Sequence, residues 1–133
     1  MSAAPTVGII LVSHSAELAA GAAHLAGQVS GGTVTIIAAG GTDDGDLGTS
    51  AAKVEHALSQ AENGAGVVVL PDLGSAVLTV RAVLEDHDDA TSVLLADAPF
   101  VEGAVAATVT AAAGGDLKAV AAAAEEARHA RKL

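Results

Sequence analysis

A histidine between two serines, Ser13-His14-Ser15, follows directly on the apolar run Val7–Val12. An imidazole in this place can attack a phosphoryl group, act as an acid or base, or bind a metal ion. The stretch after it has a helical pattern, and the free N–H groups and positive dipole end of a helix start favour an anion. The alternative is a histidine without a chemical role that only hydrogen-bonds a neighbouring loop.

A carboxylate, Asp72, stands in a comparable place in the segment "PDLGS", Pro71 to Ser75. A carboxylate that accepts a hydrogen bond from one ring nitrogen of a histidine fixes its tautomer and leaves the other nitrogen free to attack. Asp72 could instead only cap the helix that begins near Ser75. The sequence alone leaves both interpretations open.

The loop "GGTDDGDLGTS", Gly40 to Ser50, is the longest polar segment. Gly40 and Gly41 permit backbone conformations in which amides converge on an oxyanion. The loop also contains hydroxyl donors at Thr42, Thr49 and Ser50. Its acidic cluster disfavours a bare phosphate and could suggest a divalent cation, but the spacing lacks the length and the terminal Glu of an EF-hand loop.

The remaining histidines do not form a ligand pattern. Three of them lie within helical patterns and one in the acidic turn "EDHDD"; they are His24, His56, His129 and His87. Their spacing contains no HExxH or comparable pair, and the chain has no cysteine. We therefore predict surface histidines, no metal site and no cofactor.

Four short apolar runs must position these residues. They are Val7–Val12, Thr33–Ala39, Gly66–Leu70 and Ser92–Ala96. Continuous apolar runs are typical of parallel strands covered on both faces. Apolar residues at steps of three and four predict helices between and after them, beginning near Leu18, Ala51, Val77, Val101 and Leu117, the last with Asp116 as its N-cap.

This alternation predicts an α/β fold with an open, mainly parallel four-stranded sheet and helices on both faces. We expect the strand order 2-1-3-4. Ligands of such sheets gather at the carboxyl ends of the strands. The rule places His14, the loop 40–50, Asp72 and the segment 97–103 at one edge, while "SGG", "ENGA" and "DHDDA" at the opposite edge are expected to be plain turns.

Composition limits the class of protein. The 133 residues fit one domain, 1–133, and about half of them are apolar with a single aromatic residue. The many Ala and Gly residues suit helices that lie close to a sheet. Six basic against 16 acidic residues disfavour nucleic acid and anionic membranes as partners. They are compatible with a basic protein partner, although acidic surfaces also serve solubility alone.

No segment has the pattern of a signal peptide, and no apolar stretch reaches the length of a spanning helix. We therefore expect a cytoplasmic protein.

Four segments together carry a family resemblance: "VSHSAELAAG", "AAGGTDDGDLGTS", "LPDLGSAVLT" and "ADAPFVEGAVAATVTAA". In order and spacing they resemble the DhaM-type phosphotransfer subunits of bacterial dihydroxyacetone kinases, which belong with the mannose-family IIA domains of the sugar phosphotransferase system. The resemblance extends from about Val7 to Leu117. Some members carry HPr-like and enzyme-I-like segments downstream, and mannose-transporter relatives exchange a C-terminal strand, which the helical pattern of this tail disfavours.

The resemblance implies a phosphohistidine relay. His14 would accept a phosphoryl group from the phosphocarrier HPr, through the ring nitrogen Nε2, and pass it to ADP on the nucleotide-binding kinase subunit. Asp72 would orient His14, and Ser75 and Thr42 would assist transfer. Support of the phosphoryl group is expected from Gly40, Gly41, Ser13 and Ser15. A homodimer is also implied.

Two other functions stay open from the residues. One is a non-catalytic module that binds a small anion in the same place. The other is a metal-dependent enzyme of the tetrapyrrole-chelatase kind, which also carries a histidine after its first strand but needs further ligands.

Overall fold

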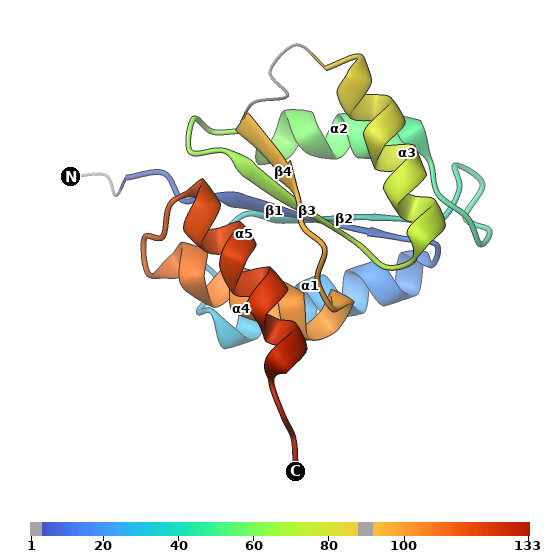
Figure 1. The fold of residues 1–133 in the computed structure, drawn as a ribbon. Helices are drawn as coiled ribbons and strands as arrows, with labels where there is room; N and C mark the ends of the chain where they lie inside the picture. The colour runs from blue at the N-terminus through green and yellow to red at the C-terminus, as the bar shows by residue number, and fades with distance from the viewer. Residues whose placement is uncertain (1–3, 88–91) are drawn as a thin grey trace.

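The computed structural model, which describes residues 4–87 and 92–133, contains one four-stranded sheet (Figure 1). Its strands are β1 (Gly8–Ser13), β2 (Ile36–Gly40), β3 (Val67–Pro71) and β4 (Val93–Leu95). All neighbouring strands are parallel, in the order β2-β1-β3-β4. The predicted α/β fold and strand order are confirmed.

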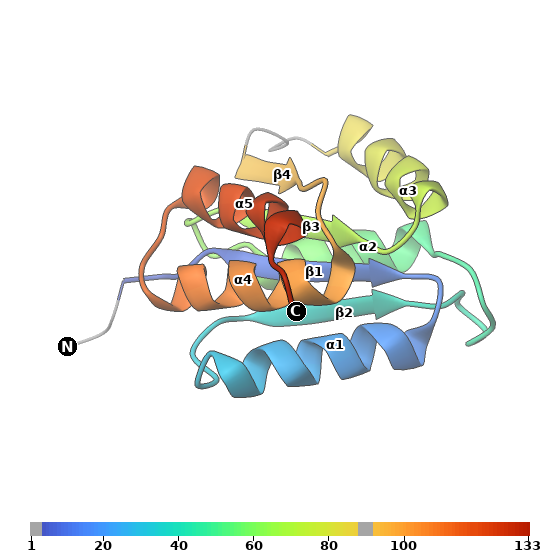
Figure 2. The same ribbon diagram turned by 60° about the horizontal axis from the view of Figure 1, so that its bottom comes forward.

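Helices cover both faces of the sheet, as predicted. They are α1 (Ala16–Val29), α2 (Ala51–Ala61), α3 (Gly74–Glu85), α4 (Phe100–Ala112) and α5 (Leu117–Glu126), followed by the short 3-10 turn η2 (Ala127–His129). Helices α1, α4 and α5 pack on one face, and α2 and α3 pack on the other (Figure 2). None of the described helices is long and apolar enough to cross a bilayer.

The central strands β1 and β3 fill both layers of the core. Their side chains alternate between the two faces, and all eight of the following are fully buried: Ile9, Leu11, Val68 and Leu70 toward α1, α4 and α5, and Ile10, Val12, Val67 and Val69 toward α2 and α3. Burial of each such side chain stabilises the fold by about 1.5–3 kcal/mol. The continuous apolar runs of the sequence therefore follow from a sheet with no exposed face.

Small residues bring α1 close to the sheet. Its buried residues are Ala19, Ala22 and Ala26, whereas Leu18, Leu25 and Val29 of the apolar pattern are 43%, 47% and 54% exposed. The helix is where the sequence predicts it, but mainly its alanines face inward. A short side chain lets helix and strand backbones approach, which is the packing that the Ala- and Gly-rich composition predicts.

Some boundaries differ from the sequence prediction. β2 begins at Ile36 rather than Thr33, because the paired register with β1 starts at Ile36 opposite Ile9. Of the residues before it, Thr35 contributes its carbonyl, which accepts from the N–H of Ile9 at 2.9 Å. Asp116 caps α5 as predicted, through a 2.9 Å bond from the N–H of Ala119. Of the predicted turn "DHDDA", residues 88–90 lie outside the described residues.

Candidate functional site

The candidate site lies where two paired strands end. His14 follows β1 and Asp72 follows β3, and the two strands pair up to Val12 and Pro71. The N–H of Asp72 extends this pairing by donating to the carbonyl of Val12 at 2.9 Å. Sheet register therefore places the carboxylate beside the histidine, as the strand-end rule predicts.

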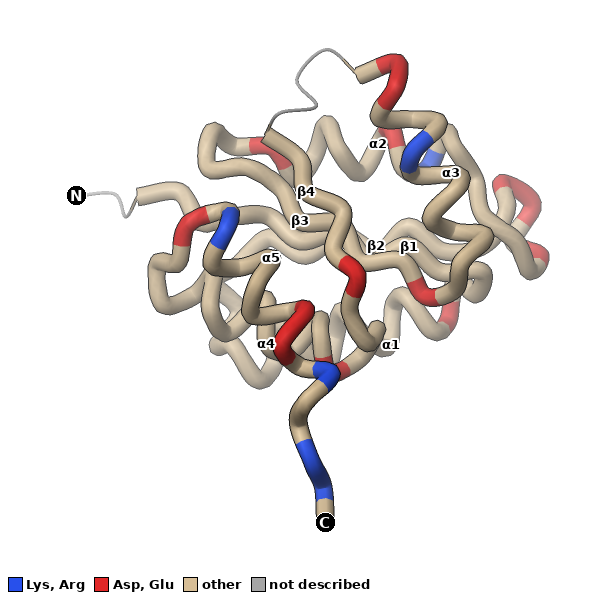
Figure 3. The backbone as a smooth tube through the Cα atoms, viewed as in Figure 1, with Lys and Arg blue, Asp and Glu red and all other residues tan. Residues whose placement is uncertain are grey.

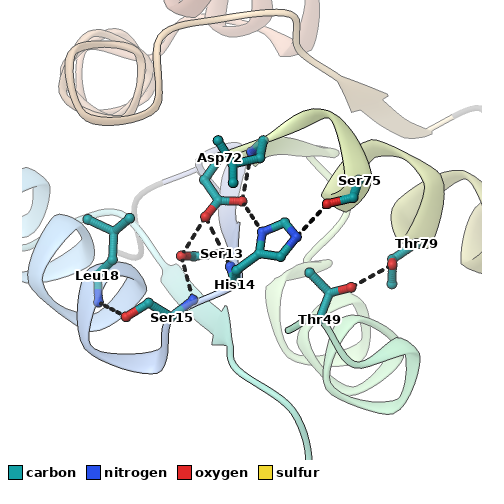
Figure 4. Close-up of polar contacts among 9 residues, drawn as sticks. Ser13, His14, Ser15, Leu18, Thr49, Asp72, Ser75 and Thr79 are labelled. Carbon is teal, nitrogen blue, oxygen red and sulfur yellow. Dashed lines mark hydrogen bonds and ion pairs between the residues drawn. The ribbon is translucent and has the colours of Figure 1, made fainter. Parts of the chain in front are cut away.

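Asp72 holds His14 at two points (Figure 4). Its Oδ1 is 2.9 Å from Nδ1 of the ring, and its Oδ2 accepts from the backbone N–H of His14 at 3.0 Å. The Asp72 side chain is 8% exposed and the His14 side chain 24% exposed. The ring is thus fixed on its buried side and open to solvent on the other.

The protonation of the pair follows from the surroundings of Asp72. Burial raises the pKa of this carboxyl, but hydrogen bonds from the His14 backbone and ring, from Ser13 and from the Leu73 N–H outweigh it, so the pKa is lowered overall. An ionised carboxylate can only accept, so Nδ1 carries the ring proton. In a neutral imidazole, Nε2 then presents its lone pair.

Ser75 is bonded to that free nitrogen. Its Oγ lies 2.5 Å from Nε2 of His14, and because Nε2 is the acceptor, the serine hydroxyl is the donor. Ser75 belongs to the first turn of α3 and is exposed. The structure thus brings His14, Asp72 and Ser75 together in one line of hydrogen bonds.

The serines on either side of His14 are engaged with protein groups. Ser13 is fully buried, donates to Oδ2 of Asp72 at 2.8 Å and accepts from the N–H of Ser15 at 3.0 Å. The Ser15 hydroxyl caps α1 by accepting from the N–H of Leu18 at 3.1 Å. Support of a phosphoryl group by either serine stays a prediction.

The predicted glycines shape the end of β2. A Cβ on Gly40 would lie 2.5 Å from the carbonyl oxygen of Ser15, so the start of α1 requires a glycine there. Gly41 has a φ of +76° and donates its N–H to the carbonyl of Ser13 at 3.1 Å. Their contribution to an anion site stays a prediction, since the N–H of Gly41 already has a protein acceptor.

Thr42 closes the loop on itself. Its Oγ1 accepts from the N–H of Asp46 at 3.1 Å, and its own N–H donates to the Asp46 carbonyl at 2.9 Å. Between described residues it makes no hydrogen bond to His14 or Ser75, and its part in transfer stays a prediction. The described residues contain no group of three or more His, Cys, Asp or Glu side chains placed to hold a metal ion.

Three contacts at this edge were not found from the sequence. The N–H of Gly48 donates to the carbonyl of His14 at 2.8 Å, and Nζ of Lys53 donates to the carbonyl of Gly40 at 2.9 Å. The hydroxyls of Thr49 and Thr79 are 2.7 Å apart and join the loop after β2 to α3 (Figure 4). The only sequence signal for Thr79 was its place one helical turn after Ser75.

Four large apolar side chains are exposed around the histidine: Leu18, Leu47, Leu73 and Leu78. Leu47 precedes Gly48, which bonds the carbonyl of His14, and Leu73 donates its N–H to Asp72. Leu78 follows Ser75 by three residues in α3, and Leu18 donates its N–H to the Ser15 hydroxyl. The same edge carries the acidic residues of the loop after β2 (Figure 3). Exposed apolar side chains beside acidic residues at one edge are candidate contacts for a protein partner.

A cavity of about 590 Å³ lies on the far side of Asp72, between α3 and the segment after β4. Its walls are mainly apolar and include Val77, Leu84, Leu95 and Ala98, with Arg81 among the lining residues. α3 therefore packs on α2 and β3, while its side toward β4 faces this cavity.

The sequence matches the protein family described as "PTS system fructose IIA component" over residues 8–121. It is 42% identical over 119 residues to the "PEP-dependent dihydroxyacetone kinase, phosphoryl donor subunit DhaM" of Pantoea ananatis, which covers 86% of this chain. The chain spans about a quarter (25%) of that relative's length.

A second relative is similar in length to this chain. The phosphoryl donor subunit DhaM of PEP-dependent dihydroxyacetone kinase 2 from Listeria innocua is 37% identical over 105 residues, covering 77% of this chain and 84% of the relative. Among solved structures, the crystal structure of EF1359, described as a protein of unknown function, superposes with a TM-score of 0.82 at 34% identity, covering 91% of this chain and 94% of that one.

Proposed function

Because the chain belongs to the IIA components of the phosphotransferase system, and within them to the DhaM-type domains, we propose that it carries a phosphoryl group on His14. The observation that carries this proposal is the line of contacts Asp72–His14–Ser75, which leaves one ring nitrogen as a lone-pair donor at an exposed edge. A nucleophile with an orienting carboxylate behind it is the arrangement that covalent transfer needs.

In the proposed step, Nε2 of His14 attacks the phosphorus of a phosphorylated donor. The Nε2–P bond forms while the bond from phosphorus to the donor breaks, and the electron pair of that bond returns to the donor. Positive charge that develops on the ring is stabilised by Asp72, whose Oδ1 is 2.9 Å from Nδ1. Such transfer requires mainly placement and charge stabilisation.

Ser75 and the start of α3 would meet the transferred group. The Ser75 hydroxyl gives up its bond to Nε2 and donates to a phosphoryl oxygen instead. Leu73, at the N-cap of α3, offers no side-chain acceptor to the first N–H groups of the helix. These N–H groups and the positive end of the helix dipole favour an anion beside Ser75.

We propose the phosphocarrier HPr as donor and ADP on the nucleotide-binding subunit of dihydroxyacetone kinase as acceptor. The names of the relatives, phosphoryl donor subunits of that kinase, support the acceptor. The exposed leucines around His14 and the acidic loop after β2 support a protein partner with an apolar patch and basic neighbours. The homodimer implied by the family stays a prediction, which the molar mass from light scattering would test.

Incubation with phosphoenolpyruvate, enzyme I and HPr tests the proposal. The chain should gain one acid-labile phosphate, and His14→Gln should abolish it while His24→Gln, at an exposed histidine in the second half of α1, should label normally. Addition of ADP with the kinase subunits should then remove the label. Equal labelling of His14→Gln would contradict the assignment of the site, and tight binding of phosphate without labelling would favour an anion-binding module.

A further inference from the structure

The distance between Ser75 and His14 depends on where α3 lies. Ser75 Oγ is 2.5 Å from Nε2, yet the two residues belong to different elements and are 61 positions apart in the chain. α3 rests on α2 and β3 on one side and faces the cavity of about 590 Å³ on the other. Packing therefore leaves the first turns of α3 less constrained on the side of β4.

A pair of hydroxyls holds these turns from the other side. Thr79 lies one turn after Ser75, and its Oγ1 is 2.7 Å from Oγ1 of Thr49 in the loop after β2. Both side chains are partly buried. Between described residues, only two side-chain hydrogen bonds join α3 to other elements, the Ser75–His14 contact and this one.

The same loop also holds the histidine. Gly48, the residue before Thr49, donates its N–H to the carbonyl of His14 at 2.8 Å. Two neighbouring residues of one loop thus fix the two partners of the Nε2–Ser75 contact. Gly48 holds the backbone of His14, and Thr49 holds α3 through Thr79 (Figure 4).

We propose that Thr49 and Thr79 are positioning residues, which set the place of the Ser75 hydroxyl relative to Nε2 of His14. This inference rests on the proposed function in so far as it concerns transfer. The geometric part, the effect of the threonine pair on the Ser75–His14 hydrogen bond, is independent of any phosphoryl donor.

Thr79→Val tests the pair because valine keeps the branched shape and removes only the hydroxyl. We expect the rate of phosphorylation by phospho-HPr to fall about fivefold, the rate equivalent of one hydrogen bond of about 1 kcal/mol. Thr79→Ser should restore most of the rate, because it keeps the hydroxyl. The double variant Thr49→Val/Thr79→Val leaves no unpaired hydroxyl and should be as slow as Thr79→Val alone.

A second measurement separates positioning from general loss of stability. In the Ser75→Ala background, Thr79→Val should have no further effect on the rate, since Thr79 is proposed to act through Ser75. Thr108→Val is the matched control: it removes a fully buried threonine hydroxyl, bonded to the carbonyl of Ala104 within α4, and should leave the rate unchanged even if it lowers the melting temperature.

Imidazole ¹⁵N spectra give a readout without a phosphoryl donor. Thr79→Val should move the Nε2 resonance of His14 in the same direction as Ser75→Ala, and Thr108→Val should not. An unchanged Nε2 resonance in folded Thr79→Val, or equal rate losses with and without Ser75, would overturn the inference. Absence of labelling in the wild-type chain would refute the proposed function and leave the spectroscopic test intact.

Discussion

Two helices begin beside His14, and they are built differently. α1 starts with a serine cap, Ser15. Its first turn lies so close to the end of β2 that a side chain on Gly40 would clash with it. α3 starts at Leu73 without a side-chain cap and has a cavity on the side of β4. The first helix follows the strand that carries the histidine, and the second carries the hydroxyl that touches its free nitrogen.

This difference divides the site into a fixed half and an adjustable half. The fixed half is the set Ser13, His14 and Asp72, which are joined to one another through the carboxylate of Asp72. The adjustable half is Ser75 on α3, whose hydroxyl leaves Nε2 for a phosphoryl oxygen in the proposed transfer. A nucleophilic side chain reacts faster when its position is fixed, whereas a hydroxyl that exchanges one hydrogen-bond partner for another must be able to move.

Removal of the carboxylate in the fixed half should have the largest effect. Asp72→Asn leaves the ring without an ionised partner for Nδ1, and we expect the phosphorylation rate to fall about a hundredfold. Stopped incubations with phospho-HPr measure the rate. Glu85→Gln, which changes an exposed carboxylate at the last residue of α3, is the control and should retain the wild-type rate. A loss below threefold in Asp72→Asn would show that the fixed half does not orient the histidine.

Gly40→Ala tests the close approach that fixes α1. The new Cβ would lie 2.5 Å and 2.8 Å from backbone atoms of Ser15 and Ala16, which cannot yield by rotating a side chain. We expect a loss of about 2 kcal/mol in the free energy of unfolding, measured with urea. The matched variant Gly21→Ala, within α1 and free of nearby atoms, should instead gain about 0.5–1 kcal/mol. Equal effects would refute the packing argument.

The fixed half should also respond to acid. The folded pKa of Asp72 lies below its ordinary value of 3.8, so its stabilising contribution is present above that pH and is lost as the pH falls through the folded pKa. The difference in urea midpoint between wild type and Asp72→Asn should therefore be constant near neutral pH and shrink below about 3.8. A difference that stays constant down to the acid transition would contradict the lowered pKa.

The smallest expected effect concerns the adjustable half. Leu73 has the extended backbone of an N-cap, with φ −126° and ψ 165°, so Leu73→Ser can supply the missing side-chain acceptor. We expect α3 to gain about 1 kcal/mol, seen as a higher melting temperature. The same replacement removes an exposed leucine beside the site and should weaken docking of HPr. An unchanged melting temperature would mean that the first N–H groups of α3 do not lack an acceptor.

Much of the site could be predicted because sheet topology determines it. Apolar runs that continue without polar interruption indicate a parallel sheet, and the strand-end rule then places His14 and Asp72 at one edge. Their hydrogen bonds follow once β1 and β3 are neighbours. The family resemblance predicts a part for Ser75 in transfer and a phosphoryl-carrying role for His14, and both stay predictions.

Contacts that depend on side-chain direction could not be predicted. In α1 both leucines and alanines recur at helical spacing, and the sequence does not say which stripe meets the sheet. Nothing in the order of residues shows that Ser13 turns inward to Asp72, or that Thr42 closes its own loop. The bond between Thr49 and Thr79 joins two helices' starting regions across 30 positions and appears only when α2 and α3 are packed together.

The peptide groups on both sides of the His14 side chain are bonded, the N–H to Asp72 and the carbonyl to Gly48. In the proposed relay, a phosphoryl group on this ring can therefore rotate with the side chain but cannot move to a second site. We therefore expect the proposed donor and acceptor to bind the same surface around His14 one after the other. We expect double-displacement kinetics, with parallel lines in reciprocal plots, and we expect surplus unphosphorylated donor to slow delivery by competing with the acceptor.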